Sequence, residues 1–102
     1  DFIYIDDVIE TILHFMSKFP QSGIYNVGTA ESHTYNQIAE WIFKAYEVQQ
    51  DVRYEEMPDN FQRFTRANIT KLRKTGFSRR LVLCEEGIRR IINDHYSNPF
   101  AN

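Results

Sequence analysis

Short apolar runs alternate with amphipathic stretches along this chain, and that alternation limits its fold more than any other feature. Two apolar runs predict strands at residues 2–5 and 24–27, and a weaker run predicts a third at 52–56. Apolar residues at helical spacing predict helices near residues 8–16, 38–46, 67–75 and 85–96. Roughly 18 residues separate the first two strands, enough for a right-handed parallel crossover. Because doubly wound sheets usually have more than three strands, the sequence predicts an α/β fold with an incomplete parallel sheet and flanking helices.

Local signals place two of the helix ends. Thr34 and Gln37 have the spacing of a capping box, which predicts that a helix begins directly after Thr34. Gly76 stands where a left-handed residue would end the third helix, and Phe77 would supply the hydrophobic contact that accompanies such an end.

Composition indicates one globular unit. The chain has 102 residues, of which 42% are hydrophobic, so it is too apolar for a disordered protein. Its single cysteine cannot form an internal disulfide, which fits a reducing compartment, and no apolar stretch approaches the roughly 18 residues of a membrane span. The chain starts on an apolar run without a methionine, so we expect that it begins within a fold.

Charge is distributed very unevenly. Residues 1–59 hold eleven acidic side chains against three basic ones, whereas residues 60–80 hold seven basic side chains and no acid. Such a block attracts anions if it folds onto one face. Arg63 and Arg66, beside Phe61 and Phe64, could hold a phosphate and stack against a ring. For the segment 71–80 the alternative is a solvated helix whose cations favour its negative C-terminal end.

Two motifs of nicotinamide enzymes are absent from the sequence. The four glycines do not have the close spacing that lets a backbone approach a dinucleotide pyrophosphate. No tyrosine is followed four residues later by a lysine, so the Tyr-x-x-x-Lys pair that transfers a proton is missing. The sequence therefore predicts neither cofactor-binding nor catalytic residues on this chain.

Other candidate groups have simpler structural explanations. Asp6 and Asp7 could form an acid–base pair, but capping of the helix that follows explains them better. Cys84 could be a nucleophile, but a thiol near a helix start is usually a packing residue. The histidines lie far apart in sequence, so no metal site is predicted from their spacing.

The segments 1–8, 23–29 and 85–88 resemble the C-terminal third of an extended short-chain dehydrogenase/reductase. A narrower resemblance rests on Met57-Pro58-Asp59, on Phe-Gln-Arg-Phe-Thr-Arg-Ala-Asn at 61–68 and on Leu-Arg-Lys-Thr-Gly-Phe at 72–77. These motifs look like those of the ADP-L-glycero-D-manno-heptose 6-epimerase family, and the resemblance covers essentially the whole chain. Three departures from the family pattern are Phe61 in place of a substrate-contacting Tyr, Asn68 in place of Asp, and a shorter loop before Phe61.

The resemblance implies a part of a larger enzyme. Residues 1–102 would be a single C-terminal substrate-binding fragment of a nucleotide-sugar epimerase, which is an isomerase. The whole enzyme would be Rossmann-like and NADP-dependent, and the fragment alone would be inactive. The cofactor would be held by a missing N-terminal part, and the enzyme would be a cytoplasmic homo-oligomer that makes heptose for the lipopolysaccharide inner core. Phe61, Gln62 and Arg63 would bind ADP-heptose or a related nucleotide sugar, with no metal, nucleic acid or membrane involved.

Two alternatives remain open at this point. The same lobe occurs in other extended dehydrogenases, such as a UDP-hexose 4-epimerase, a dehydratase or a decarboxylase. A protein of a different class, a non-catalytic module, could bind an anionic ligand through residues 60–80.

Overall fold

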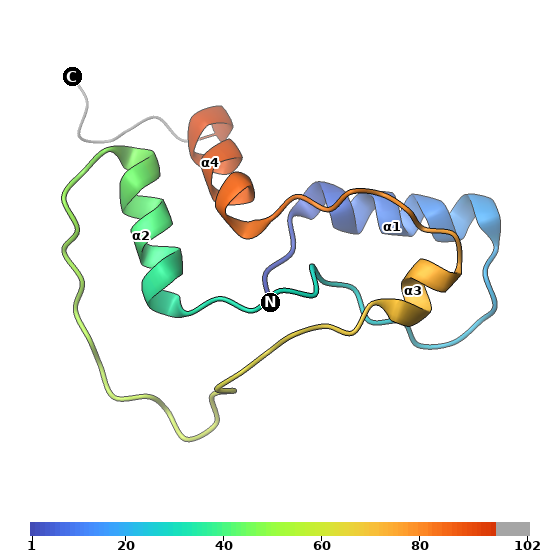
Figure 1. Cartoon of the computed structure of the whole chain (residues 1–102), viewed down its shortest axis with the longest axis horizontal. Helices are drawn as coiled ribbons and strands as arrows, with labels where there is room; N and C mark the ends of the chain where they lie inside the picture. The colour runs from blue at the N-terminus through green and yellow to red at the C-terminus, as the bar shows by residue number, and fades with distance from the viewer. Residues whose placement is uncertain (96–102) are drawn as a thin grey trace.

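The computed structural model describes residues 1–95, which contain four helices and no strand (Figure 1). The helices are α1 (Ile5–Lys18), α2 (Tyr35–Tyr46), α3 (Thr70–Lys74) and α4 (Cys84–His95). Helix α2 packs against α4, while α1 and α3 lie at the other end of the molecule. None of these helices is long and apolar enough to cross a membrane.

The predicted α/β fold is wrong, because none of the three expected strands forms. Residues 2–4 and 24–27 run without regular structure, and residues 52–56 belong to a long exposed loop. An apolar run becomes a strand only where a neighbouring segment satisfies its backbone N–H and C=O groups in a ladder. In the described residues, the side chains of Asp1 and Lys71, rather than strand partners, bind the N-terminal segment and the segment at 24–29.

The helix ends agree better with the sequence. Thr34 caps α2 as predicted, since its Oγ1 accepts a hydrogen bond from the Gln37 backbone N–H at 3.1 Å. Gly76, which follows the C-cap Thr75 of α3, has a φ of 91°, as the expected left-handed end requires. Asp6 and Asp7 are not caps: the N-cap of α1 is Tyr4, and both aspartates lie in the first helical turn.

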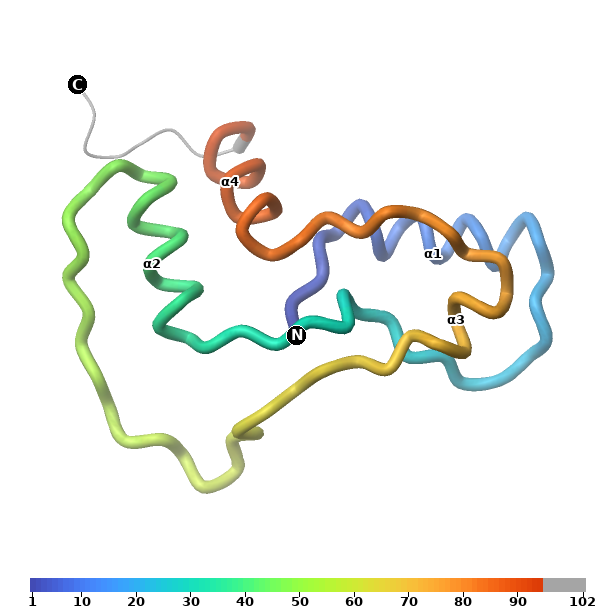
Figure 2. Tube along the Cα trace, in the orientation of Figure 1, coloured from blue at the N-terminus to red at the C-terminus, as the bar shows by residue number. Residues whose placement is uncertain are grey.

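Two carboxylates connect distant parts of the chain. Asp7 is fully buried and accepts hydrogen bonds from Arg79 Nε and from the Val82 backbone N–H, both at 2.8 Å. The segment that leads from α3 to α4 is thereby held along α1 (Figure 2). The Asp1 carboxylate accepts hydrogen bonds from Thr29, Ala30 and Ala67, at distances of 2.7 to 3.0 Å; this network is called the Asp1 junction.

Gly28 allows the Asp1 junction to close. A Cβ atom at this position would come within 2.6 Å of the Ala67 Cβ and within 2.8 Å of Asp1 Oδ2. The chain therefore needs a residue without a side chain where the segments before and after the long loop meet.

The hydrophobic core is small. Its main cluster consists of Leu72, Phe77 and Leu81, with Phe15 of α1 and Ile69 packed against them. Among the described residues, the other buried hydrophobic ones are Val82, Cys84 and Ile92. Phe77 is buried, as expected for the residue that follows the glycine at the end of α3. Many other large apolar side chains are exposed, so this cluster covers only part of the apolar surface that the sequence offers.

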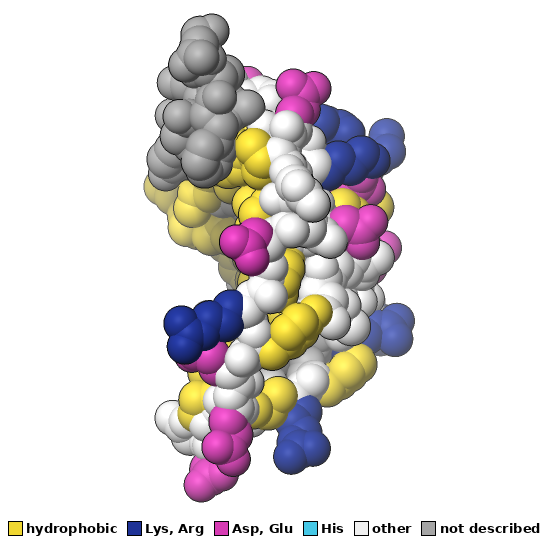
Figure 3. All heavy atoms as spheres, turned by 90° about the vertical axis from the view of Figure 1, so that its left-hand side faces the viewer, with side chains coloured by type: hydrophobic (Ala, Val, Ile, Leu, Met, Phe, Trp, Pro, Cys, Tyr) yellow, Lys and Arg dark blue, Asp and Glu magenta, His cyan; other side chains and the backbone are white. Residues whose placement is uncertain are grey.

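The molecule is flat and open. Its principal extents are 49, 37 and 16 Å, and its radius of gyration is 16.6 Å, against about 13 Å for a compact domain of 100 residues. Figure 3 shows the narrow side, where apolar and charged side chains are interspersed. Residues 48–69 form a single long loop outside the helices, along one edge of the molecule (Figure 1).

Candidate functional site

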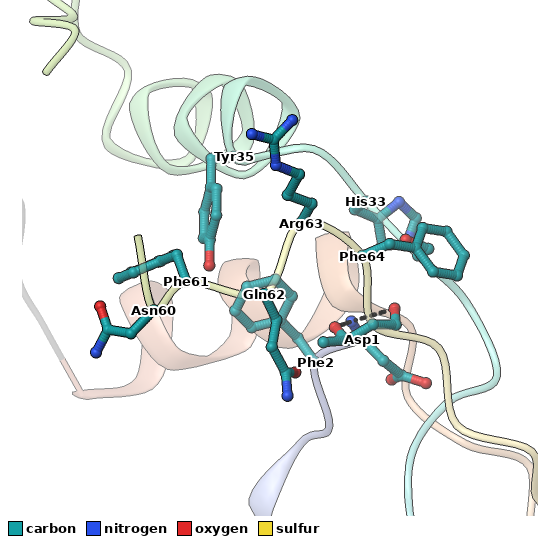
Figure 4. Close-up of a pocket in the computed structure, with 11 residues that line it drawn as sticks. Asp1, Phe2, His33, Tyr35, Asn60, Phe61, Gln62, Arg63 and Phe64 are labelled. Carbon is teal, nitrogen blue, oxygen red and sulfur yellow. Dashed lines mark hydrogen bonds between the residues drawn. The ribbon is translucent and has the colours of Figure 1, made fainter. Parts of the chain in front are cut away.

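A pocket of about 360 Å³ lies where the N-terminal segment, the start of α2 and the end of the long loop meet (Figure 4). Its lining combines aromatic rings with polar and cationic side chains: Asp1, Phe2, Ser32, His33, Tyr35, Asn60, Phe61, Gln62, Arg63, Phe64 and Thr65. A volume of this size and a mixed lining are typical of small-molecule sites.

The three residues selected from the sequence, Phe61, Gln62 and Arg63, all line this pocket. A turn positions them, because the Phe61 backbone N–H donates to the Pro58 carbonyl at 3.1 Å. Figure 4 shows Tyr35 at the start of α2 beside Phe61, and their ring centroids lie 6.4 Å apart. The sequence-selected loop therefore faces a helix more than twenty positions earlier in the chain.

Two aromatic residues of the pocket were not selected from the sequence. Tyr35 also contacts Phe2 edge-to-face, with 6.4 Å between the ring centroids, so Phe2, Tyr35 and Phe61 form an aromatic row. The sequence pattern places Phe2 in a predicted strand, and Tyr35 directly after the cap of a predicted helix. The spacing of these three positions in the sequence does not indicate that they meet. The Asp1 junction holds together the chain segments that carry them.

Arg63 is the cation of the pocket. Within residues 1–95 its guanidinium makes no hydrogen bond or ion pair, and its side chain is exposed. Asp1 also lines the pocket, and its carboxylate is engaged in the Asp1 junction. An anion that enters the pocket would therefore meet a guanidinium that has no other partner in the described part of the chain.

The rest of the basic block mostly holds the chain together. Arg66 donates to the Ala30 carbonyl at 2.9 Å, and Lys71 donates to the Ile24 carbonyl at 2.8 Å. Arg73 donates to two backbone carbonyls, and Arg79 binds Asp7. Lys71, Arg73 and Lys74 also lie in the last turn of α3, where the sequence alternative predicted cations at the negative helix end. Because four of the seven basic side chains bond to backbone carbonyls or to Asp7, the seven charges do not form one uniform anion-binding face.

The histidine of the pocket is held in place by its neighbours. His33 Nδ1 lies 3.1 Å from Gln37 Oε1, its Nε2 lies 3.3 Å from Glu31 Oε2, and its ring packs edge-on against Trp41. Among the described residues, no three His, Cys, Asp or Glu side chains come together in a way that could hold a metal ion.

No protein-family profile matches the chain. Among curated proteins, an ADP-L-glycero-D-manno-heptose-6-epimerase of Nitratidesulfovibrio vulgaris strain DP4 is 29% identical over 106 residues, which cover 98% of this chain and 33% of the relative. The epimerase of the same name from strain Hildenborough is 32% identical over 92 residues, which cover 86% of this chain and 28% of the relative.

The chain resembles ADP-L-glycero-D-manno-heptose-6-epimerases along almost its whole length. The resemblance stated from residues 57–59, 61–68 and 72–77 is therefore confirmed. The chain spans about a third of the length of these epimerases, so roughly two thirds of each relative has no counterpart here.

Proposed function

We propose that this chain is the substrate-binding part of a nucleotide-sugar epimerase whose substrate is ADP-heptose. The similarity to the heptose epimerases supports the class of enzyme. The pocket supports the role of this part, because the loop residues that carry the resemblance line it. The observation that carries the proposal is the unpaired guanidinium of Arg63 beside the aromatic row of Phe2, Tyr35 and Phe61.

The chemistry of the pocket suits a nucleoside diphosphate sugar. Aromatic faces bind an adenine ring by stacking, and a guanidinium binds phosphate oxygens through two parallel hydrogen bonds. Gln62 and Asn60 add amide groups that can donate to and accept from sugar hydroxyls. The Tyr35 hydroxyl, close to Phe61, offers a further donor in a pocket where Phe61 itself has none.

The four glycines of this chain do not have the spacing of a dinucleotide-binding loop for NADP, the cofactor that the family resemblance implies. A dinucleotide needs backbone that a pyrophosphate can approach closely, and glycines normally supply it. The space beside Gly28 is filled by Ala67 and Asp1, and Lys71 Nζ lies within 3.1 Å of a Cβ built at Gly23. We therefore assign cofactor binding and hydride transfer to the rest of the enzyme, and substrate binding to this part. The product would enter lipopolysaccharide heptose synthesis.

The proposal is tested with an epimerase-length protein that contains this chain. That protein should interconvert the two C6 epimers of ADP-heptose, which chromatography of the sugar nucleotides separates. The 102-residue chain alone should bind the sugar nucleotide without converting it. Conversion of a UDP-hexose instead of ADP-heptose would contradict the substrate assignment, and conversion by the 102-residue chain alone would contradict the division of roles.

A further inference from the structure

Tyr35 occupies the middle of the aromatic row. Its ring centroid lies 6.4 Å from that of Phe2 and 6.4 Å from that of Phe61. Among the Phe and Tyr rings that line the pocket in the described part of the chain, Tyr35 is the one that carries a hydroxyl. Figure 4 shows its side chain pointing from the start of α2 into the pocket, with the hydroxyl directed toward Phe61 and Gln62. The phenol is therefore presented to a molecule that enters the pocket.

Several other polar groups of the pocket are already bonded within the chain. Both ring nitrogens of His33 lie within 3.3 Å of side-chain oxygens, and Thr65 Oγ1 accepts a hydrogen bond from the Asp1 amine at 2.6 Å. Five polar side chains of the lining make no hydrogen bond within residues 1–95: Ser32, Tyr35, Asn60, Gln62 and Arg63. A ligand can bind these five groups without breaking a bond that holds the fold together.

Tyr35 is held more firmly than the other four unbonded side chains. It is the one of the five that belongs to a described helix, and it follows directly after Thr34, whose hydroxyl caps α2 at 3.1 Å. The rings of Phe2 and Phe61 limit its movement on two sides. A tyrosine side chain also has few rotatable bonds, so it loses little conformational entropy when a ligand binds. Its hydroxyl is therefore the best-positioned hydrogen-bonding group of the pocket.

From this geometry we infer that the Tyr35 hydroxyl binds a sugar hydroxyl of the sugar nucleotide. This inference rests on the proposed function, in which Arg63 takes the phosphate oxygens. A phenol O–H donates one hydrogen bond and also accepts, and the Gln62 amide toward which it points has both donors and an acceptor. Together the two side chains match the neighbouring hydroxyls of a sugar ring. Ribose and heptose share this chemistry, and the test distinguishes them.

The test measures dissociation constants of ADP-heptose, ADP and inorganic pyrophosphate for an epimerase-length protein by calorimetry. Tyr35→Phe should weaken ADP-heptose binding about three- to tenfold, because it removes one hydrogen bond and keeps the ring. Tyr54→Phe is the matched control: it removes the same hydroxyl from an exposed tyrosine of the long loop, outside the pocket lining, and should leave binding unchanged. Pyrophosphate has no sugar, so its affinity should be the same for wild type and Tyr35→Phe.

An equal loss for ADP would place the bonded hydroxyl on the ribose, and a loss confined to ADP-heptose would place it on the heptose; either result supports the inference. Tyr35→Phe protein that binds ADP-heptose like wild type would overturn it, as would weaker pyrophosphate binding by this variant or an equal loss for Tyr54→Phe. Wild-type protein that does not bind ADP-heptose would contradict the proposed function as well. Wild-type protein that binds and converts ADP-heptose, with Tyr35→Phe unaffected, would contradict this inference alone.

Discussion

The buried carboxylate of Asp7 accepts a hydrogen bond at 2.8 Å from Arg79 Nε, 72 positions later in the chain. This bond raises the pKa of Arg79, which therefore stays charged at every pH that the protein tolerates. The second carboxylate oxygen of Asp7 accepts from the Val82 backbone N–H. One side chain of α1 thus holds the segment that connects α3 with α4.

Asp7→Ala should lower the free energy of unfolding by about 1.5–3 kcal/mol, because it leaves the buried Val82 N–H without an acceptor. Asp6→Ala is the control, since Asp6 is exposed in the same helical turn and should cost less than about 1 kcal/mol. Urea denaturation followed by circular dichroism measures both. Equal losses for the two variants would show that Asp7 acts only through the helix dipole.

Gly28→Ala should disrupt the Asp1 junction, because the new Cβ would overlap the Ala67 Cβ at 2.6 Å. Gly76→Ala is the comparison: its Cβ meets nothing within 4 Å, and its cost comes only from the positive φ, at about 1 kcal/mol. We expect Gly28→Ala to lose more stability than Gly76→Ala in the same urea experiment. Ala67→Gly added to Gly28→Ala should restore part of the loss, and no restoration would argue against that contact.

Burial raises the pKa of the Cys84 thiol. Folding therefore favours the neutral thiol, so this contribution to stability is complete below the pKa of the unfolded thiol. It is lost as the pH rises from there toward the higher folded value. Between pH 8 and 10 wild-type chain should lose more stability than Cys84→Ala chain, and iodoacetamide should modify the folded thiol more slowly than the thiol in urea. Equal alkylation rates in the two conditions would contradict this.

The sequence predicted the helices and their ends better than the apolar segments that connect them. Thr34 and Gly76 act locally, through bonds and backbone angles within a few residues, so their roles can be predicted from neighbouring positions. The runs at 2–5 and 24–27 depend on a partner strand, which no local pattern can guarantee. Here the Asp1 carboxylate joins the segments instead, and a single aspartate gives no periodic signal.

The loop residues of the candidate pocket could be selected from the sequence, whereas its other aromatic lining residues could not. Phe61, Gln62 and Arg63 could be selected because aromatic and basic residues are adjacent in sequence and resemble a known motif. Phe2 and Tyr35 reach the same pocket only through tertiary contacts, so their place in its lining appears only in the structure. The seven basic side chains of residues 60–80 had the same limitation. Their sequence predicts a positive electrostatic field, whereas in the structure most of them bond to backbone carbonyl groups or to Asp7.

Phe61→Ala in an epimerase-length protein should raise the Michaelis constant for ADP-heptose, because the aromatic row loses its contact with Tyr35. Phe61→Tyr should keep the constant near the wild-type value, since a tyrosine ring fills the same place. The exposed Phe64, also in the pocket lining, serves as a comparison for a general loss of aromatic surface. A Phe61→Ala enzyme with an unchanged Michaelis constant would exclude Phe61 from the binding site.

The most direct test of the substrate-binding role is the dissociation constant of ADP-heptose for wild-type, Arg63→Ala and Lys74→Ala forms of an epimerase-length protein. Arg63 lines the pocket, whereas Lys74 is an exposed residue of α3 outside it. Loss of a hydrogen bond to a charged phosphate should cost about 1.5–3 kcal/mol, or roughly 10- to 150-fold in affinity, for Arg63→Ala alone. Lys74→Ala should bind like wild type. Equal losses for the two variants would mean that the basic block acts as a diffuse field, and that the pocket at Phe61–Arg63 is not the binding site.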